Sequence, residues 1–479
     1  MPLFVGILVS FIVLHRLEGL TTSKKYSSSI SMNKLIGYPS NYSSFLKAWK
    51  TLYTAQKEIV LFIAEYADRG TLRCPNRLKY LGCYNYLIDN SLYQMKLLED
   101  LRSMTQDETT RDSLTNYVEK MIYRNQNPKH CRDIEVIGYE TKEYCGLGCQ
   151  IHLLGYCLIV ALGEGKPLVV KSDEWQGFDS IFDVLMPLSE TCHYNMTKSH
   201  NLKVEFINLS YHYKNMEYLP KVIPENIRQQ IEEFHTDPFL WWIAQIITYV
   251  LRLRPNVIEN LEPKEFTSPI VGVHVRRTDK LVKEAKSYPV EEYMKYVELY
   301  FRKLGITSKG PKKSVYLATD DSHVISQFRW RYPDYTFITS NVRYLRNRHD
   351  QKGTYSILSD IYNLANTDYL VCTFSSNVCR LAFQLMNGKR MDASENYHSL
   401  DHVFLYAYQQ TPSFSLRLNH TIGDLMLDKT STVYLSDRQN GRYLTVKLKK
   451  SSEDIKVPAY KLKENLLTTN FKAFENINT

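Results

Sequence analysis

The chain has 479 residues, which is long enough for roughly two to four domains with a substantial core. Its hydrophobic fraction of 44% is ordinary for a globular protein and argues against gross disorder. The net charge of +9 comes without a Lys/Arg-rich block, so we expect no nucleic-acid partner and favour small anionic ligands. The 36 tyrosines suit surfaces that contact sugars or bases.

An apolar run from Pro2 to Leu14 lies at the N-terminus. It is shorter than a membrane span, which needs about 20 residues, and is typical of the core of a signal peptide. We therefore expect residues 1–20 to be a signal peptide or a short signal anchor, with a buried helix as the alternative. Four N-glycosylation sequons fit entry to the secretory pathway and begin at Asn41, Asn195, Asn208 and Asn419.

The cysteines agree with that route. Seven of the nine lie in the first 192 residues, at positions 74, 83, 131, 145, 149, 157 and 192. Cys372 and Cys379 follow much later. In an oxidising compartment we expect disulfides, with one cysteine left over because the number is odd. A zinc site is not favoured, because no C-x2-C pair or spaced histidines accompany Cys145 and Cys149.

Two long amphipathic segments, 46–67 and 91–104, have apolar residues at spacings of three and four, which predicts helices. Between them, residues 73–83 carry a proline and two cysteines. Residues 22–45 are rich in Ser, Thr, Lys and Tyr, which is typical of a tether. We interpret 21–124 as a helical stem, which is either a dimer partner surface or a cap on the next domain.

From residue 125 the pattern becomes mixed. Residues 149–162 read as an apolar helix entered through a glycine-rich turn, and 168–172 read as a strand. Residues 237–251 read as a helix with Asp237 as its N-cap and Pro238 in its first turn. We expect an open α/β domain over 125–268.

The next block repeats a pattern of strand, polar exit and helix. The predicted strands are 270–275, 314–318, 335–339 and 368–374. The predicted helices are 290–304 and 378–386, and a polar loop is expected from Ser340 to Gly353. Short apolar strands that alternate with helices predict a parallel sheet, here a Rossmann-like domain over 269–398. Such sheets bind ligands beyond the carboxyl ends of their strands.

After residue 399 the pattern changes to short strands and turns, with a hairpin signal at Asn440-Gly441. We expect a small β-barrel over 399–468, followed by a tail at 469–479.

The polar residues after the strands predict an anion site. Arg276 and Arg277 point to opposite faces of a straight strand, so at least one faces the crevice, where a guanidinium suits a diphosphate. A salt bridge to Asp279 or Asp320 is the structural alternative. The Ser375-Ser376-Asn377 segment reads as a helix N-cap with free backbone N–H groups. Together these features favour a nucleotide or nucleotide sugar, while P-loop and dinucleotide fingerprints are absent from the sequence.

Two carboxylate groups have competing interpretations. Thr319-Asp320-Asp321 is either part of a metal site or, as we expect with arginines nearby, part of a metal-independent site. Glu284 is either a general base that takes a proton from an acceptor hydroxyl or a solvated loop glutamate.

Several motifs in order resemble the α-1,6-fucosyltransferases that modify N-glycan cores. They are VGVHVRRTDK with EA and PVEEYM after it, VYLATDD, SDIYNLANTDYLVCTFSSNVCRLAFQLM, DASENYHSLD, and upstream NPKHC, CGLGCQIHLLGYC, SETC and DPFLWWIAQ. The resemblance runs from about residue 125 to the C-terminus. It implies a GT-B-like α/β glycosyltransferase with a Rossmann-like nucleotide-binding domain, an N-terminal helical stem and a C-terminal SH3-like β-barrel.

The resemblance also implies roles for individual residues. GDP-fucose would be the donor, with inversion and without a metal or other cofactor, and the acceptor would be the 6-hydroxyl of the innermost GlcNAc of an N-glycan. The implied catalytic residues are Glu284 as base, Arg276 on the diphosphate, Lys280 and Asp279. The implied donor-binding residues are His274, Arg276, Arg277, Asp360, Ser375, Ser376, Asn377, Gly148 and Cys149. The implied activity-supporting residues are Tyr293, Asp320, Asp321 and Asp401. The implied disulfides are Cys131–Cys192, Cys145–Cys149 and Cys372–Cys379.

The sequence departs from the family pattern at four places. Cys157 has Tyr139 where its usual partner stands, which leaves it free or paired with Cys74 or Cys83. Phe178 stands in for a tyrosine near the ribose, and Asp401-His402 replaces paired aspartates. The turn at 437–441 lacks a Trp and a His that help to hold the glycan.

The sequence therefore predicts a fucosyltransferase of the Golgi lumen that acts on N-glycan cores, with an N-terminal membrane anchor or in secreted form and with a homodimer through the stem. One alternative is a GDP-fucose transferase with a different acceptor. The other is a glycan- or nucleotide-binding protein without catalysis, although Glu284, Arg276 and Lys280 together argue against it.

Overall fold

The structure is a computed structural model. It describes residues 42–68, 83–104, 108–141, 145–207, 217–218, 221–277, 286–306, 310, 312–340, 350–403, 411–423, 425–437, 443–449 and 451–475.

Within the described residues, three helices form the N-terminal part: α2 (Tyr42–Asp68), α4 (Cys83–Met104) and α5 (Glu108–Gln126). Helices α2 and α4 pack through an apolar cluster that includes Trp49, Tyr53 and Leu92. The Trp49 indole N–H donates to the carbonyl of Leu98 at 2.7 Å. Leu299 of the following domain joins this cluster, so the predicted helices also pack against the α/β region.

The first α/β domain contains a three-stranded parallel sheet in the order β2-β1-β3. Its strands are β1 (Glu135–Glu140), β2 (Leu168–Lys171) and β3 (Lys203–Phe206), and its two main helices are α6 (Leu147–Glu164) and α8 (Pro238–Val250). As predicted, Asp237 caps α8 by accepting from the Leu240 N–H at 3.0 Å. Among the described residues α6 alone is long and apolar enough to cross a membrane, but 89% of it is buried inside the protein, as in a core helix.

The end of the chain returns to this first domain. Strand β17 (Leu467–Thr469) pairs in parallel with β4 (Val222–Pro224). Beyond it, Phe471 and Phe474 are buried against Trp242 of α8, with ring centroids 5.7 and 5.8 Å away. The segment assigned as a tail from the sequence therefore contributes to the core. The remaining short helices of this domain are α7 (Arg228–Glu232) and α9 (Pro255–Glu259).

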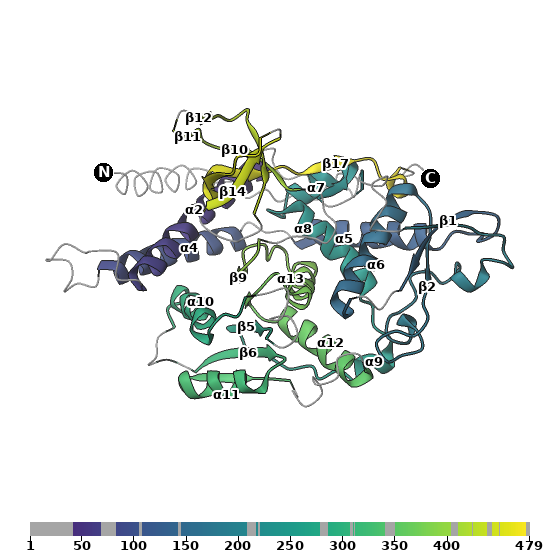
Figure 1. The fold of residues 1–479 in the computed structure, drawn as a ribbon, viewed down its shortest axis with the longest axis horizontal. Helices are drawn as coiled ribbons and strands as arrows, with labels where there is room; N and C mark the ends of the chain where they lie inside the picture. The colour runs from purple at the N-terminus through teal and green to yellow at the C-terminus, as the bar shows by residue number, and fades with distance from the viewer. Residues whose placement is uncertain are drawn as a thin grey trace, which may run out of the picture. The chain divides into compact units, whose positions relative to one another are not determined.

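The second α/β domain is built on a five-stranded, fully parallel sheet in the order β7-β6-β5-β8-β9. Its strands are β5 (Ile270–Val275), β6 (Lys313–Thr319), β7 (Tyr335–Ile338), β8 (Tyr369–Cys372) and β9 (Tyr397–Ser399). Its helices are α10 (Val290–Lys303), α11 (Ser322–Arg331), α12 (Gln351–Ala365) and α13 (Asn377–Lys389). The parallel sheet and its crossover helices confirm the fold predicted for this block (Figure 1).

Alternate strand residues face two apolar cores. Val271, Val273 and Val275 pack with α10 and α11, whereas Ile270 packs in the core that contains α12 and α13. The predicted loop to Gly353 is wrong at its end, because α12 already begins at Gln351. Asp350 is its N-cap and accepts from the Gly353 N–H at 2.7 Å, so the glycine lies inside the first turn.

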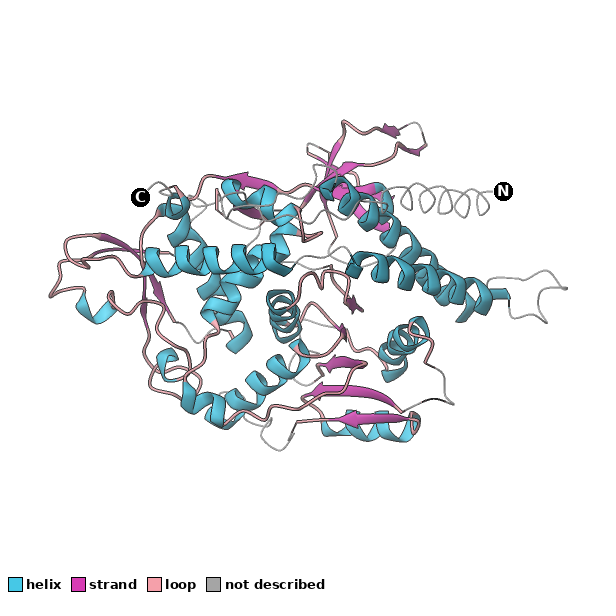
Figure 2. Cartoon of the chain, turned by 180° about the vertical axis from the view of Figure 1, so that it is seen from behind, coloured by secondary structure: helices cyan, strands magenta, loops and turns pink. Residues whose placement is uncertain are grey.

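The C-terminal region contains an antiparallel sheet in the order β15-β14-β13-β10-β16 around its own apolar core (Figure 2). Its strands are β10 (Ser413–Leu416), β13 (Thr432–Leu435), β14 (Tyr443–Leu448), β15 (Ile455–Pro458) and β16 (Leu462–Glu464). A hairpin of β11 (His420–Ile422) and β12 (Leu425–Leu427) is added. Strands β13 and β14 pair across the predicted Asn440-Gly441 turn, which itself lies outside the described residues. The SH3-like assignment stays a prediction.

Candidate functional site

The order of the strands identifies one edge of the parallel sheet as the candidate site. From β5 the chain proceeds to β6 and β7 on one side, then crosses to β8 and β9 on the other. The point where the strand order reverses lies between β5 and β8, and in open parallel sheets ligands bind beyond the carboxyl ends of the strands at this point. Arg276 and Arg277 follow β5 there, and Ser375 and Ser376 follow β8.

Asp320, at the end of β6, organises the two arginines. Its carboxylate accepts from the backbone N–H of Arg277 at 2.8 Å and lies 3.5 Å from the guanidinium of Arg276. The Arg277 guanidinium turns elsewhere and donates to the Gln327 side chain at 3.3 Å and to the Tyr288 carbonyl at 3.4 Å. The two guanidinium groups thus have different partners. The salt bridge to Asp320, which was the structural alternative to a ligand-binding role, is present at Arg276, whose side chain is 17% exposed.

The N-terminus of α13 supplies the second element. Ser376 is its N-cap residue, as predicted, with extended backbone angles. Its hydroxyl accepts no hydrogen bond from the first turn, whose residues are all described. Backbone N–H groups at a helix N-terminus and the helix dipole together favour an anion. Arg380 contributes a side chain that sequence reasoning missed, since its guanidinium donates to the Asn377 side chain; its position one turn into the helix is the available signal.

The first turn of α6 lies directly against this helix start. A Cβ atom on Gly148 would be 2.8 Å from the Cβ of Asn377, so only glycine permits this approach. His152 links the helices, with Nδ1 2.8 Å from the Gly148 carbonyl and Nε2 3.0 Å from the Gln384 side chain. Burial lowers the pKa of His152 to about 3, so this link is neutral. Gly148 and Cys149, predicted as a turn before the helix, instead lie in the first turn of α6, which begins at Leu147. Gly148 is a neighbour of Asn377 at the start of α13.

A buried carboxyl group lies in α12. Asp360 accepts from the Tyr316 hydroxyl at 2.6 Å, and burial raises its pKa from 3.8 to about 6. Tyr316 also hydrogen-bonds with Ser340, and burial raises the pKa of Tyr316 as well. Sequence reasoning missed Tyr316; its hydroxyl in the middle of the buried part of strand β6 is the signal that a buried polar partner exists. His274, the other residue predicted to contact guanosine, lies in β5 and is 5% exposed.

The residues predicted to support activity have distinct surroundings. Asp401 accepts from the Ser375 N–H at 3.3 Å and from the Ser399 hydroxyl at 3.2 Å, so it fixes the loop that leads into α13. Tyr293 is buried in α10; burial, with the nearby Asp401 charge, raises the pKa of its hydroxyl. Asp321 caps α11 by accepting from the His323 N–H at 2.9 Å.

Asp320 and Asp321 are thus separately engaged and do not form a pair. Within the part of the chain that the structure describes, no group of three His, Cys, Asp or Glu residues could hold a metal ion. The predicted residues Asp279, Lys280 and Glu284 lie in 278–285, outside the described residues. Phe178 is buried and packs edge-on against Tyr355 of α12, with ring centroids 5.7 Å apart.

All three implied disulfides are present: Cys131–Cys192, Cys145–Cys149 and Cys372–Cys379. Cys157 is free and buried, which raises the pKa of its thiol and makes it unreactive. The sequon residues Asn195 and Asn419 are exposed, whereas Asn41 and Asn208 lie outside the described residues.

Comparison with known proteins matches residues 52–406 to the model of the alpha-(1,6)-fucosyltransferase N- and catalytic domains. An alpha-(1,6)-fucosyltransferase of Drosophila melanogaster is 30% identical over 422 residues, which cover 82% of this chain and 68% of the fly protein. One of Caenorhabditis elegans is 29% identical over 324 residues, which cover 63% of this chain and 58% of the worm protein.

Among solved structures, the NodZ alpha-1,6-fucosyltransferase soaked with GDP-fucose aligns with a TM-score of 0.34 and 18% identity, over 52% of this chain and 92% of that chain. An Arabidopsis thaliana FUT1 mutant in complex with GDP aligns with a TM-score of 0.33 and 14% identity, over 56% of this chain and 72% of that chain.

Proposed function

We propose that this chain, which belongs to the alpha-(1,6)-fucosyltransferase family of glycosyltransferases, transfers L-fucose from GDP-fucose to the 6-hydroxyl of the innermost GlcNAc of N-glycans, with inversion. The observation that carries the donor side is the pairing of two anion-binding elements at one sheet edge. Arg276 follows β5, and the N-terminus of α13 follows the neighbouring strand β8.

These elements suit a departing diphosphate. As the bond from fucose C1 to the phosphate breaks, negative charge develops on the leaving group, and groups already aimed at that charge lower the barrier. Arg276 and the N–H groups of α13 supply positive potential, so the proposed reaction uses no metal. The Asp360 carboxylate is an acceptor suited to the N–H groups of guanine, and the Gly148-Cys149 turn lies beside the phosphate position.

The roles proposed on the acceptor side are inferred from the sequence alone, because residues 278–285 lie outside the described residues. Glu284 is the proposed general base for the acceptor hydroxyl, and Lys280 polarises the base or the acceptor. Holding that hydroxyl beside Glu284 and in line with fucose C1 supplies the remaining rate enhancement.

We place the protein in the Golgi lumen. Three disulfides suit an oxidising compartment, and the exposed sequons at Asn195 and Asn419 are accessible for glycosylation. The proposed architecture is GT-B-like with an SH3-like C-terminal barrel. The proposal also includes an N-terminal anchor and a homodimer through the stem, where exposed apolar side chains support a partner: Ile59, Phe62, Tyr86, Tyr93 and Leu97.

The test is transfer from GDP-fucose to a panel of glycans, with linkage determined by NMR. Wild type should fucosylate the core GlcNAc at O6, and Glu284→Gln should lose transfer while it still binds GDP. Glu292→Gln, an exposed glutamate in the first turn of α10, is the matched control. Absence of both GDP binding and transfer would refute the enzyme. Transfer only to another glycan would contradict the assignment of the core GlcNAc as acceptor. Equal rates of transfer for wild type and Glu284→Gln would contradict the assignment of Glu284 as general base.

A further inference from the structure

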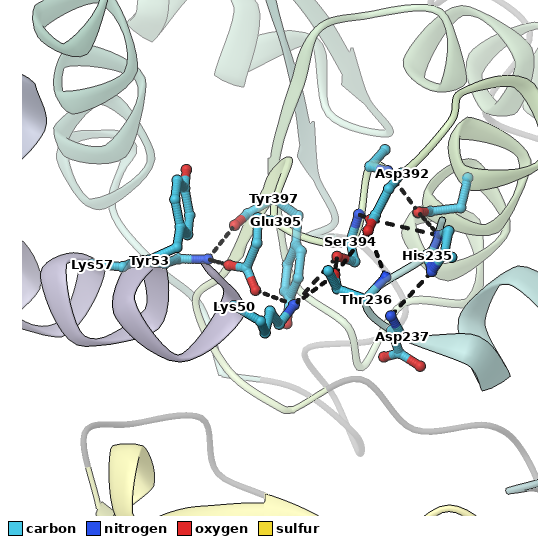
Figure 3. A network of polar contacts seen from close by, with 12 residues as sticks. Lys50, Tyr53, Lys57, His235, Thr236, Asp237, Asp392, Ser394, Glu395 and Tyr397 are labelled. Atoms are coloured by element: carbon cyan, nitrogen blue, oxygen red, sulfur yellow. Dashed lines mark hydrogen bonds and ion pairs between the residues drawn. The ribbon is translucent and has the colours of Figure 1, made fainter. Parts of the chain in front are cut away.

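The segment before β9 is held by the N-terminal helices through ion pairs (Figure 3). The Lys57 ammonium of α2 lies 2.9 Å from one carboxylate oxygen of Glu395, and Lys50, two turns earlier, ion-pairs with the other oxygen. The three side chains are only 14–23% exposed. Burial alone would raise the pKa of Glu395, but the two lysines outweigh it and lower that pKa from 4.5 to about 2. A single carboxylate thus ion-pairs with two lysines of one helix.

A second carboxylate three residues earlier anchors the same segment. Asp392 is fully buried and ion-pairs with Arg102 of α4. It also accepts from the Thr236 N–H at 2.7 Å and from the Thr236 hydroxyl at 2.8 Å. Lys50 reaches the Ser394 hydroxyl at 3.2 Å, which closes the network between the two carboxylates. The position of residues 392–395 is therefore set by α2, α4 and the residue before α8's N-cap.

A short chain of contacts connects this segment to residues 373–376, the loop between β8 and α13. Lys57 also donates to the carbonyl of Tyr397, the first residue of β9, at 3.5 Å. The Tyr397 ring packs on Phe374 with centroids 4.9 Å apart. At the other end of β9, the Ser399 hydroxyl accepts from the Phe374 N–H at 3.2 Å, and Asp401 accepts from the Ser375 N–H at 3.3 Å. Phe374 and Ser375 lead directly into the N-cap of α13.

We propose that Glu395 is a positioning residue for the donor site: by fixing β9 against α2, it sets the backbone N–H groups that bind the diphosphate. Lys57 and Lys50 are its partners. The N-terminal helices thereby hold the edge of the parallel sheet where the proposed donor site lies. The inference rests on the proposed function for the identity of the donor.

The variants Glu395→Gln and Lys57→Met break the connection without changing the donor site itself. Glu232→Gln is the matched control, because Glu232 pairs with Lys47 of the same helix at 3.1 Å but has no contact with β9 among the described residues. Calorimetry measures the Kd of GDP, hydrogen exchange measures protection of the Ser375 amide, and urea denaturation measures stability.

For Glu395→Gln we expect a Kd for GDP that is about 2- to 30-fold higher than in wild type, a similar rise in KM for GDP-fucose, and a smaller change in kcat. The Ser375 amide should exchange faster in the ligand-free protein. Lys57→Met should act in the same direction, and the double variant should show less than the sum of the two effects. Glu232→Gln should leave the Kd and the exchange unchanged.

If Glu395→Gln and Lys57→Met lower stability but bind GDP as Glu232→Gln does, the network is only structural and the inference is wrong. Should Glu395→Gln not fold, Lys57→Met, which keeps the pair of Lys50 with Glu395, decides the question by the same readouts. Failure of the proposed function is distinguishable, because wild type itself would then neither bind GDP nor transfer fucose.

Discussion

Two arginine–aspartate pairs in this chain have the same chemical groups but differ in geometry and in the exposure of the arginine. Arg102 and Asp392 are 6% and 0% exposed, and Asp392 accepts further hydrogen bonds from Thr236 and Ser394. Arg276 lies 3.5 Å from Asp320, longer than a hydrogen bond, and is 17% exposed at the sheet edge. The first pair is closed and holds helices together. The second leaves the Arg276 side chain partly exposed at the sheet edge, at the proposed ligand site.

The largest loss of stability should come from breaking the buried ion pair between Arg102 and Asp392. Asp392→Asn leaves Arg102 buried without its counter-charge, which should lower the free energy of unfolding by about 3–5 kcal/mol. Urea denaturation followed by circular dichroism measures this loss. A loss of under about 1 kcal/mol would mean that the pair is no more important than a surface ion pair.

Removing Arg276 should affect activity more than stability, because the buried Asp320 carboxylate still accepts from the Arg277 N–H. Arg276→Ala deletes the positive group proposed for the leaving diphosphate, so kcat should fall about 100- to 1,000-fold. Initial rates of fucose transfer measure the effect, and Arg276→Lys should recover only part of the rate because the bidentate fork is lost. An unfolding free energy that falls as far as in Asp392→Asn would erase the contrast between the pairs.

The affinity for GDP should depend on pH through the carboxyl group of Asp360. Because burial raises the pKa of Asp360 to about 6, its carboxyl group is protonated in the ligand-free protein below that pH. If the carboxylate accepts from guanine, GDP affinity should rise as pH increases through 6 and fall by up to about tenfold per unit below it. Calorimetry from pH 5 to 8 measures this slope, which Asp360→Asn should flatten. An identical slope in that variant would assign the titration to another group.

The smallest effect should come from an exposed pair on the same helix as the network. Lys47 is 56% exposed and pairs with Glu232 at 3.1 Å, so Lys47→Met should cost about 0–1 kcal/mol. Thermal unfolding is sensitive enough to detect the difference. If Lys47→Met lowers the free energy of unfolding as much as Asp392→Asn does, burial does not explain the difference between exposed and buried ion pairs.

The sequence predicted the parallel sheet and its polar edge because each strand is a short apolar run with a distinctive exit, such as Arg276-Arg277 or Ser375-Ser376. It misplaced the start of α12, since Gly353 reads as a loop residue but lies in a first turn capped by Asp350. Periodicity also gave no indication that Phe471 and Phe474 join a core.

The network around Glu395 could not be predicted at all. Glu395 and Lys57 are 338 residues apart, and each alone resembles a solvated surface charge. Local pattern reports which face of an element is apolar, but not which distant charge will meet it. The family resemblance singled out Asp401, but no local pattern indicated that it would accept from the Ser375 N–H.

The return of β17 to β4 determines when this protein can finish folding. Trp242 and α8 are synthesised more than two hundred residues before Phe471 and Phe474, which cover them. During translation the first α/β domain must therefore wait with part of its apolar interior uncovered until residues 467–474 leave the ribosome. In the interval, the uncovered part of this domain is a defined surface for chaperones to shield.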